Sequence, residues 1–191
     1  MKKTLLLGIT VLALSAFTII SGTWKNDAAH SQLGFTVSHL GVSDISGTFN
    51  DFEVVVNSSK PDFSDASFEL SAKAASIDTR VGMRDDHLKS ADFFDAAKYP
   101  ALTFKSTSLK KAANNKYKIA GNLTIHGVTK AVIMDLAYNG TIENPMNKKP
   151  TAGFTLSGTI KRSDFDLGAK FPAPMISDEV QIHASGEFIQ N

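Results

Sequence analysis

The segment from Ser76 to Phe104 carries the side chains whose types and spacing could do chemistry. Arg80, Arg84 and His87 stand four and three residues apart, so on a helix they would share one face. Two guanidinium groups and an imidazole on one face suit a phosphate or carbonyl head group. The alternative is that the arginines form surface ion pairs with neighbouring aspartates and bind nothing. We expect a head-group site formed mainly by Arg80, Arg84 and His87, with His39 and Arg162 as secondary candidates.

The same segment contains Asp85, Asp86 and His87 in succession, which are residue types that a hydrolase uses for acid–base catalysis. Adjacent positions on a helix point apart, however, so local ion pairs on a solvated face explain the run equally well. The chain has no Gly-x-Ser-x-Gly, phosphate-binding loop or dinucleotide fingerprint, and no nucleophile paired with a base. We therefore predict no catalytic residues, and keep a hydrolase that uses His87 with Asp85 or Asp86 as an alternative.

Histidine and cysteine usage argues against a metal or redox function. The five histidines form no His-x-His or His-x-x-x-His pair, and the chain has no cysteine. We expect no metal site, no disulfide and no cofactor. Subtracting Lys2 and Lys3 from the 20 basic residues leaves 18, against 19 acidic ones. This balance offers no excess positive charge for nucleic acid.

The first residues resemble a secretory signal. Lys2 and Lys3 precede an uncharged apolar run from Leu5 to Ile20, which is short for a membrane span. We predict a signal peptide over residues 1–22, cleaved between residues 16 and 22, and a periplasmic or secreted protein with no membrane span after cleavage. The alternative is an uncleaved anchor. Residues 23–191 show no linker or internal repeat and are predicted to form one domain.

Most of the remaining chain alternates apolar and polar residues with the period of two that is typical of strands. About eight such strands follow one another at hairpin spacing, which predicts an antiparallel barrel or a sandwich. Within the strand from Gly47 to Val56, Phe49 and Phe52 stand three residues apart, which indicates a bulge between them.

One helical insertion interrupts the strands at about residues 79–98. Asp78 and Thr79 are good N-cap residues, and Pro100 disfavours a helical conformation at Tyr99. The insertion is therefore expected to begin at Asp78 or Thr79 and to end before Pro100.

A barrel of about eight strands can fill its interior with side chains or hold one elongated ligand. Several residues expected to point inward are small, which suits a bore with room in it. They are Ala72, Ala74, Gly121, Gly158, Ala184 and Gly186. The alternative is that these are ordinary bulge and twist positions.

A series of short motifs runs in order through nearly the whole chain after residue 23. They are Trp24-x-x-Asp27-x-x-His30-Ser31, Phe35-x-Val37-x-His39, Gly47-x-Phe49-x-x-Phe52, Ser76-Ile77-Asp78-Thr79, Arg84-Asp85-x-His87-Leu88, Asp92-Phe93-Phe94-Asp95, Tyr99-Pro100-x-x-x-Phe104, Gly121-x-Leu123-Thr124-Ile125-His126-Gly127-Val128-Thr129-Lys130, Gly153-Phe154, Arg162-Ser163-Asp164-Phe165 and Ser177-Asp178-Glu179-Val180. Each is weak by itself, but the set resembles the YceI-like family, the lipid- or polyisoprenoid-binding proteins of the bacterial periplasm. The chain departs from the family pattern at Asp166-Leu167-Gly168.

The resemblance implies an all-β fold, a single extended, antiparallel, eight-stranded, lipocalin-like barrel with a short helical insertion. It implies an apolar bore that holds an isoprenoid lipid non-covalently, such as a polyprenyl phosphate or an isoprenoid quinone. It also implies a periplasmic or secreted carrier without catalytic residues. On this basis we expect the lipid tail to be lined by Phe35, Val37, Phe49, Phe68, Leu70, Phe94, Phe104, Leu123, Met134, Phe154 and Ile182.

The irregular apolar segment from Phe165 to Met175 is expected to form a mobile flap or a simple hydrophobic plug at one end of the bore. A rival interpretation is a ligand-free interaction protein of envelope stress, with a solid core and an exposed apolar patch at Ser163–Ser177. The sequence leaves open whether the chain forms a homodimer.

Overall fold

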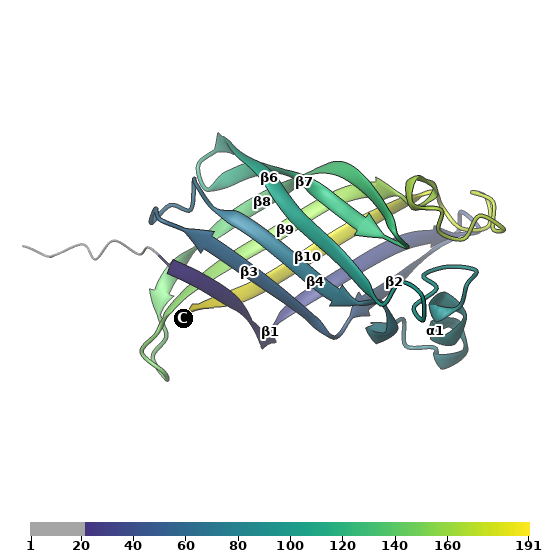
Figure 1. Ribbon diagram of the computed structural model, residues 1–191, viewed down its shortest axis with the longest axis horizontal. Helices are drawn as coiled ribbons and strands as arrows, with labels where there is room; N and C mark the ends of the chain where they lie inside the picture. The colour runs from purple at the N-terminus through teal and green to yellow at the C-terminus, as the bar shows by residue number, and fades with distance from the viewer. Residues whose placement is uncertain (1–21) are drawn as a thin grey trace, which may run out of the picture.

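The computed structural model describes residues 22–191, which are drawn in colour in Figure 1. The predicted signal peptide, residues 1–22, lies outside the described residues apart from Gly22. No helix in the described range is long and apolar enough to cross a membrane. The elements are, in chain order, β1 (Gly22–His39), β2 (Ser43–Phe49), β3 (Phe52–Ser58), β4 (Ser67–Lys73), the 3₁₀ turn η1 (Ala74–Ser76), β5 (Ile77–Asp78), α1 (Gly82–Lys89), β6 (Ala101–Ala113), β7 (Lys116–Ile125), β8 (Val128–Glu143), β9 (Pro150–Lys161), the 3₁₀ turn η2 (Arg162–Phe165) and β10 (Glu179–Gln190).

Hydrogen-bonded strand pairs close into an antiparallel barrel of eight strands. β1 pairs with β3, and the circuit continues through β4, β6, β7, β8 and β9 to β10, which pairs back with β1. The second half of β1 also pairs with β2, and β2 pairs with the short β5, so these strands prolong the barrel at the end where α1 lies (Figure 1). The predicted all-β barrel with one short helical insertion is confirmed.

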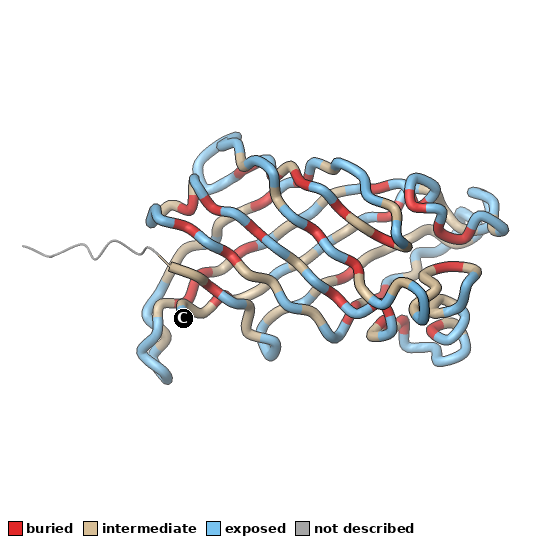
Figure 2. The backbone as a smooth tube through the Cα atoms, in the orientation of Figure 1, coloured by how far each residue is buried: buried red, intermediate tan, exposed pale blue. Residues whose placement is uncertain are grey.

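Alternation along each strand places apolar side chains inside the barrel and polar ones outside. On β7, Tyr117, Ile119 and Leu123 are buried, while Lys118 and Asn122 between them are exposed. Figure 2 shows buried and exposed positions alternating in this way on neighbouring strands. One apolar core therefore runs along the barrel axis.

The regular pairing of the strands is interrupted at several places. The predicted single strand from Gly47 to Val56 is two strands, because β2 ends at Phe49, the chain bends at Asn50 and Asp51, and β3 begins at Phe52. The expected bulge between Phe49 and Phe52 is therefore a break between strands. A second irregularity gave no signal in the alternation: the pairing of β1 with β10 changes register between Asn26 and Ser31. Residues 28–30 are exposed at this second bend.

The helical insertion is shorter than predicted and begins later. α1 starts at Gly82, and Val81 before it is extended. Arg80 lies outside the helix with a φ of 67°, and its backbone N–H donates to Asp78 Oδ1 at 2.7 Å. The predicted start with Asp78 or Thr79 as N-cap is therefore wrong, because Asp78 stabilises a left-handed turn at Arg80 instead of the first turn of a helix.

The loop between β3 and β4 closes the end of the barrel opposite α1 (Figure 1). Phe63 of this loop is buried although its φ of 55° lies in the left-handed region. Its ring centroid lies 5.0–5.2 Å from the rings of Trp24, Tyr138 and Phe154. Packing of these rings sustains the strained backbone, and the loop acts as an aromatic plug.

Candidate functional site

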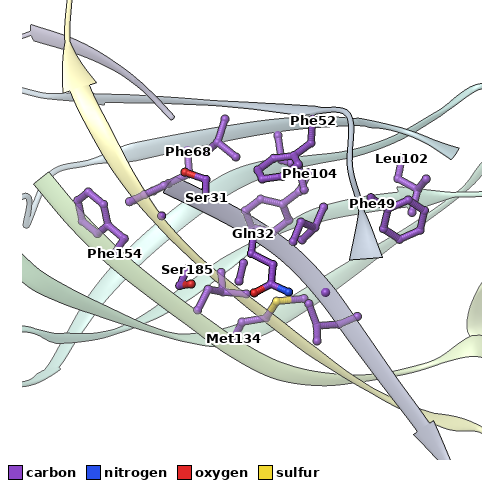
Figure 3. Close-up of a pocket in the computed structure, with 18 of the residues that line it drawn as sticks. Ser31, Gln32, Phe49, Phe52, Phe68, Leu102, Phe104, Met134, Phe154 and Ser185 are labelled. Atoms are coloured by element: carbon purple, nitrogen blue, oxygen red, sulfur yellow. The ribbon is translucent and has the colours of Figure 1, made fainter. Parts of the chain in front are cut away.

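Two cavities follow one another along the barrel axis. The central cavity measures about 140 Å³ and lies in the middle of the barrel (Figure 3). Its only polar side chains come from Ser31, Gln32 and Ser185. The end cavity measures about 360 Å³ and lies beneath α1 and the β9–β10 loop. The two volumes are adjacent, because six residues line both of them: Phe35, Phe49, Leu102, Ile125, Ile160 and Ile182.

The structure brings all eleven predicted tail-lining residues to these cavities. The largest group lines the central cavity alone: Phe68, Leu70, Phe104, Leu123, Met134 and Phe154. Val37 and Phe94 line the end cavity, and the remaining three line both. Ten of the eleven lie on strands, where alternation shows which face a residue occupies. Phe94 lies in the segment after α1, where alternation gives no such information.

The small inward residues do not all leave empty space. A Cβ added at Gly121 would lie 2.4 Å from the Phe104 ring, and one at Gly158 would lie 2.8 Å from Met134. These two glycines therefore admit a facing side chain rather than a ligand. Ala184 and Gly186 do line the central cavity.

Four of the five predicted head-group residues line the end cavity, namely Arg84, His87, His39 and Arg162. Arg80 lines neither cavity and is exposed. The expectation that Arg80 shares a helical face with Arg84 and His87 is wrong, because α1 begins after it and its backbone turns left-handed.

Arg84 is held in the cavity wall by two hydrogen bonds from its guanidinium group. Its Nε donates to Thr79 Oγ1 and its Nη2 to the Thr79 carbonyl, both at 2.7 Å. Thr79 in turn donates from its N–H (2.8 Å) and its hydroxyl (2.5 Å) to Asp85 Oδ1. Burial would raise the pKa of Asp85, but these hydrogen bonds from Thr79 outweigh it and lower the pKa. Within the described residues Nη1 of Arg84 has no partner, so this cation can bind a further acceptor.

Arg162 lines the end cavity but already uses its donors on the protein. Its guanidinium donates to five backbone carbonyls of the β9–β10 loop, those of Leu167, Gly168, Phe171, Ile176 and Ser177. Five N–H groups thus meet five carbonyls, which leaves no donor for a ligand. The geometry assigns Arg162 to the folding of the loop and not to a head group.

The segment after α1 and the β9–β10 loop meet over the end cavity. The rings of Phe93 and Phe171 stack, and His87 packs edge-on against both. Asp92 accepts from Lys170 Nζ at 2.6 Å and lies 3.3 Å from His87 Nε2. The hydrogen bond from Lys170, with a second from His87, lowers the pKa of Asp92. These contacts form a lid, and part of the predicted flap, at Leu167, Phe171 and Met175, lines the cavity beneath it.

The structure does not bring together the residues of the alternative hydrolase, which would use His87 with Asp85 or Asp86. Asp85 is turned to Thr79, and the exposed Asp86 lies 3.4 Å from Lys89 Nζ. The acidic partner of His87 is Asp92, inside the lid. Neither Asp85 nor Asp86 is therefore paired with His87 as a catalytic base would require.

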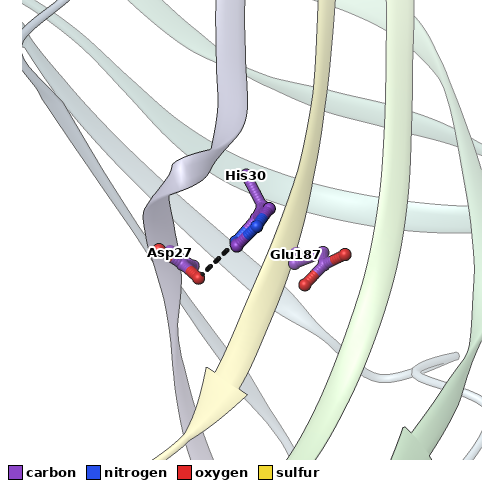
Figure 4. Close-up of side chains that lie close together, drawn as sticks. All are labelled: Asp27, His30 and Glu187. Atoms are coloured by element: carbon purple, nitrogen blue, oxygen red, sulfur yellow. Dashed lines mark hydrogen bonds and ion pairs between the residues drawn. The ribbon is translucent and has the colours of Figure 1, made fainter. Parts of the chain in front are cut away.

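One polar cluster outside the bore was missed by sequence reasoning. At the bend of β1, His30 Nδ1 lies 2.7 Å from Asp27 Oδ2, with Glu187 of β10 close by (Figure 4). The hydrogen bond to Asp27 is the main cause that raises the pKa of His30, and the charges of both carboxylates add to it. The cluster is a hydrogen-bonded pair within the bend of β1, with the carboxylate of Glu187 beside it.

The sequence is similar to a known domain family and to curated proteins. The model of the YceI-like domain matches residues 24–188. The UPF0312 protein plu2095 of Photorhabdus laumondii is 39% identical over 178 residues, covering 89% of this chain and 91% of the relative.

The fold is shared with solved structures. The structure of Burkholderia cenocepacia BcnA superposes with a TM-score of 0.74 at 28% identity, covering 87% of this chain and 99% of the other. A polyisoprenoid binding domain from Saccharophagus degradans, implicated in plant cell wall breakdown, superposes with a TM-score of 0.65 at 15% identity, covering 90% and 99%. With a family model that matches nearly the whole described range, the chain belongs to the YceI-like domain family.

Proposed function

We propose that this protein binds one long isoprenoid-type lipid, such as a polyprenyl phosphate or an isoprenoid quinone, and carries it in the periplasm or outside the cell. The observation that carries the proposal is the polarity of the bore. The central cavity is apolar and leads towards the Phe63 plug, whereas the end cavity adds the polar side chains of His39, Thr79, Arg84 and His87. An amphiphile would place its tail in the first cavity and its head in the second.

Burial of the tail supplies the affinity. Each CH₂ removed from water is worth about 0.8 kcal/mol. Burial of several isoprene units therefore offsets the cost of ordering the tail and the cost of the translational and rotational freedom that the whole lipid loses. The polyisoprenoid binding domain of Saccharophagus degradans, which shares the fold, supports this choice of ligand class. No catalytic step belongs to the proposal, because binding alone accounts for the groups that line the bore.

The first test is to identify the lipid that the protein acquires in the cell. The full chain is expressed, the exported protein is purified without detergent, a native mass spectrum is recorded, and bound lipid is extracted. We expect one isoprenoid lipid per chain. A spectrum that stays empty after incubation with polyprenyl phosphates and quinones would reject the proposal.

A bore-filling variant tests where the tail lies. Ala184 lines the central cavity, so Ala184→Phe should fill it and displace the tail while the protein stays folded. The matched control is Ala131→Phe, which adds the same ring on the exposed face of β8. Retention of lipid by Ala184→Phe, with thermal unfolding unchanged, would place the tail elsewhere.

The rival interaction protein predicts a bore packed solid. Two adjacent cavities of about 140 and 360 Å³ count against it. The same native mass spectrum separates the two interpretations, because the rival requires no bound lipid under any loading condition.

A further inference from the structure

Exposed aliphatic side chains gather on two segments beside the end cavity. Leu40 and Val42, on the turn between β1 and β2, are 56% and 83% exposed. Val81 and Met83, at the start of α1, are 43% and 86% exposed. Each segment is adjacent in the chain to a residue that lines the end cavity: His39 precedes Leu40, and Arg84 follows Met83. We call these four residues the rim.

The fold gives no reason for aliphatic residues at these positions. Tight hairpin turns favour Asn, Asp and Gly, yet the β1–β2 turn carries Leu40 with a φ of 54°, a conformation that is unfavourable for an aliphatic residue. None of the four rim residues belongs to the core or packs against it. Large aliphatic side chains kept in water beside the end cavity indicate a surface that is covered in use.

We propose that the rim inserts into the surface of a zwitterionic lipid bilayer, so that the end cavity exchanges its ligand directly with the membrane. This rests on the proposed lipid-binding function. The rim is continuous with the end cavity, whose lining is mostly apolar and whose polar side chains include His39 and Arg84 next to the rim. A lipid could therefore pass its tail from the bilayer into the cavity while these side chains meet its head group.

The net charge of the chain fits shallow insertion rather than long-range attraction to anionic lipid. Within the described residues the guanidinium of Arg80, next to Val81, makes no hydrogen bond or ion pair, and it can reach a lipid phosphate. The chain without Lys2 and Lys3 nevertheless has 18 basic residues against 19 acidic ones, so long-range attraction is absent. Binding should therefore need no anionic lipid and should persist in high salt.

The test is flotation of the purified, exported protein with vesicles of phosphatidylcholine, with its N-terminus determined by mass spectrometry. The rim variant combines Leu40→Asn, Val42→Thr and Met83→Gln, none of which lines a cavity. We expect the parent protein to float with the vesicles, and the rim variant to show at least a tenfold weaker partition. Addition of phosphatidylglycerol or of salt should change the parent's partition less than threefold.

The matched control removes aliphatic surface at the far end of the barrel. Ile142 and Met146, on β8 and the β8–β9 loop, are 64% and 91% exposed, and this loop lies away from α1 (Figure 1). Ile142→Thr with Met146→Gln should float like the parent. Equal loss in the control variant, equal flotation of the rim variant, or a rim-dependent dimer in sedimentation without vesicle binding would each overturn the proposal.

A second readout separates this proposal from the lipid-binding function itself. The rim variant should bind a short-chain isoprenoid offered in solution with unchanged affinity, but should extract it from vesicles at least tenfold more slowly. If the parent binds the isoprenoid in solution and does not float, docking is wrong and lipid binding stands. If the parent floats but retains no isoprenoid under any condition, lipid binding fails while insertion of the rim stands.

Discussion

The rings of Phe93 and Phe171 stack with centroids 5.0 Å apart and planes inclined by 16°. Phe93 comes from the segment after α1 and Phe171 from the β9–β10 loop, so this contact joins two segments nearly eighty residues apart in the chain. Both rings line the end cavity. The bore is therefore sealed at one end by the buried Phe63 and covered at the other by a contact between two irregular segments.

Loss of the Phe171 ring should open the lid. In Phe171→Ala the stacking on Phe93 disappears, an interaction worth about 1 kcal/mol beyond its buried area. We expect a bound fluorescent isoprenoid to exchange roughly fivefold to tenfold faster, as measured by stopped-flow displacement. Unchanged exchange would show that the ligand leaves by another route.

The ion pair between Lys170 and Asp92 should matter less than the rings. Lys170 is largely exposed, and exposed pairs contribute about 0–1 kcal/mol. Lys170→Ala should therefore accelerate exchange of the bound fluorescent isoprenoid by less than Phe171→Ala does. Its control is Lys118→Ala, which breaks an exposed pair with Asp135 on the barrel wall and should leave exchange unchanged.

Removal of the Arg162 guanidinium should loosen the whole β9–β10 loop. Arg162→Met keeps the apolar stem but leaves five carbonyls without their donor, which should cost roughly 2–4 kcal/mol of unfolding free energy. Urea unfolding measures the loss, and hydrogen exchange should show faster exchange of backbone amides across residues 167–177. Arg162→Lys should recover only part of the lost unfolding free energy, because a single ammonium group cannot reproduce the planar array of five guanidinium donors. Protection of the loop amides at the parent level would contradict the assignment.

The sequence predicted the bore better than its ends, for a physical reason. Lining residues such as Phe68 and Leu123 lie on strands, where a period of two fixes which face each residue occupies. Arg80 was misplaced because the start of α1 depends on a left-handed turn at Arg80 itself. Phe63 lies in an irregular loop, where no period shows which way a ring points. Arg162 gave no sign of its role, since its partners are carbonyls that only the folded loop brings together.

The loop that carries the Phe63 plug should lose stability in acid. Partial desolvation of the Asp65 carboxyl would raise its pKa, but hydrogen bonds from the hydroxyls of Ser58 and Ser59 and the N–H of Ser59 outweigh it and lower the pKa to about 2. A carboxyl whose pKa is lower in the folded state stabilises fully above its unfolded pKa of 3.8, and this contribution disappears as the pH falls through about 2.

Asp65 is exposed, so its contribution after solvent screening should be about 1 kcal/mol. Urea midpoints measured between pH 5 and about pH 2 should fall more steeply for the parent than for Asp65→Asn. The single change Ser59→Ala should give an intermediate slope. Parallel pH profiles for parent and Asp65→Asn would exclude this carboxylate as the source.

The unpartnered Nη1 of Arg84 predicts a preference for charged head groups. Arg84→Gln keeps a polar amide in the cavity wall but removes the charge, and a hydrogen bond to a charged group is worth about 1.5–3 kcal/mol. Affinity for a polyprenyl phosphate should therefore fall about tenfold to a hundredfold, while affinity for a neutral isoprenoid quinone stays the same. Both affinities are measured by quenching of the fluorescence of Trp24, the single tryptophan, which packs on the Phe63 plug, or by calorimetry if the quench is small.

Arg80→Gln is the matched control, because Arg80 lines neither cavity and its loss should change neither affinity. An equal loss for phosphate and quinone in Arg84→Gln would mean that Arg84 shapes the cavity wall and does not bind the head group.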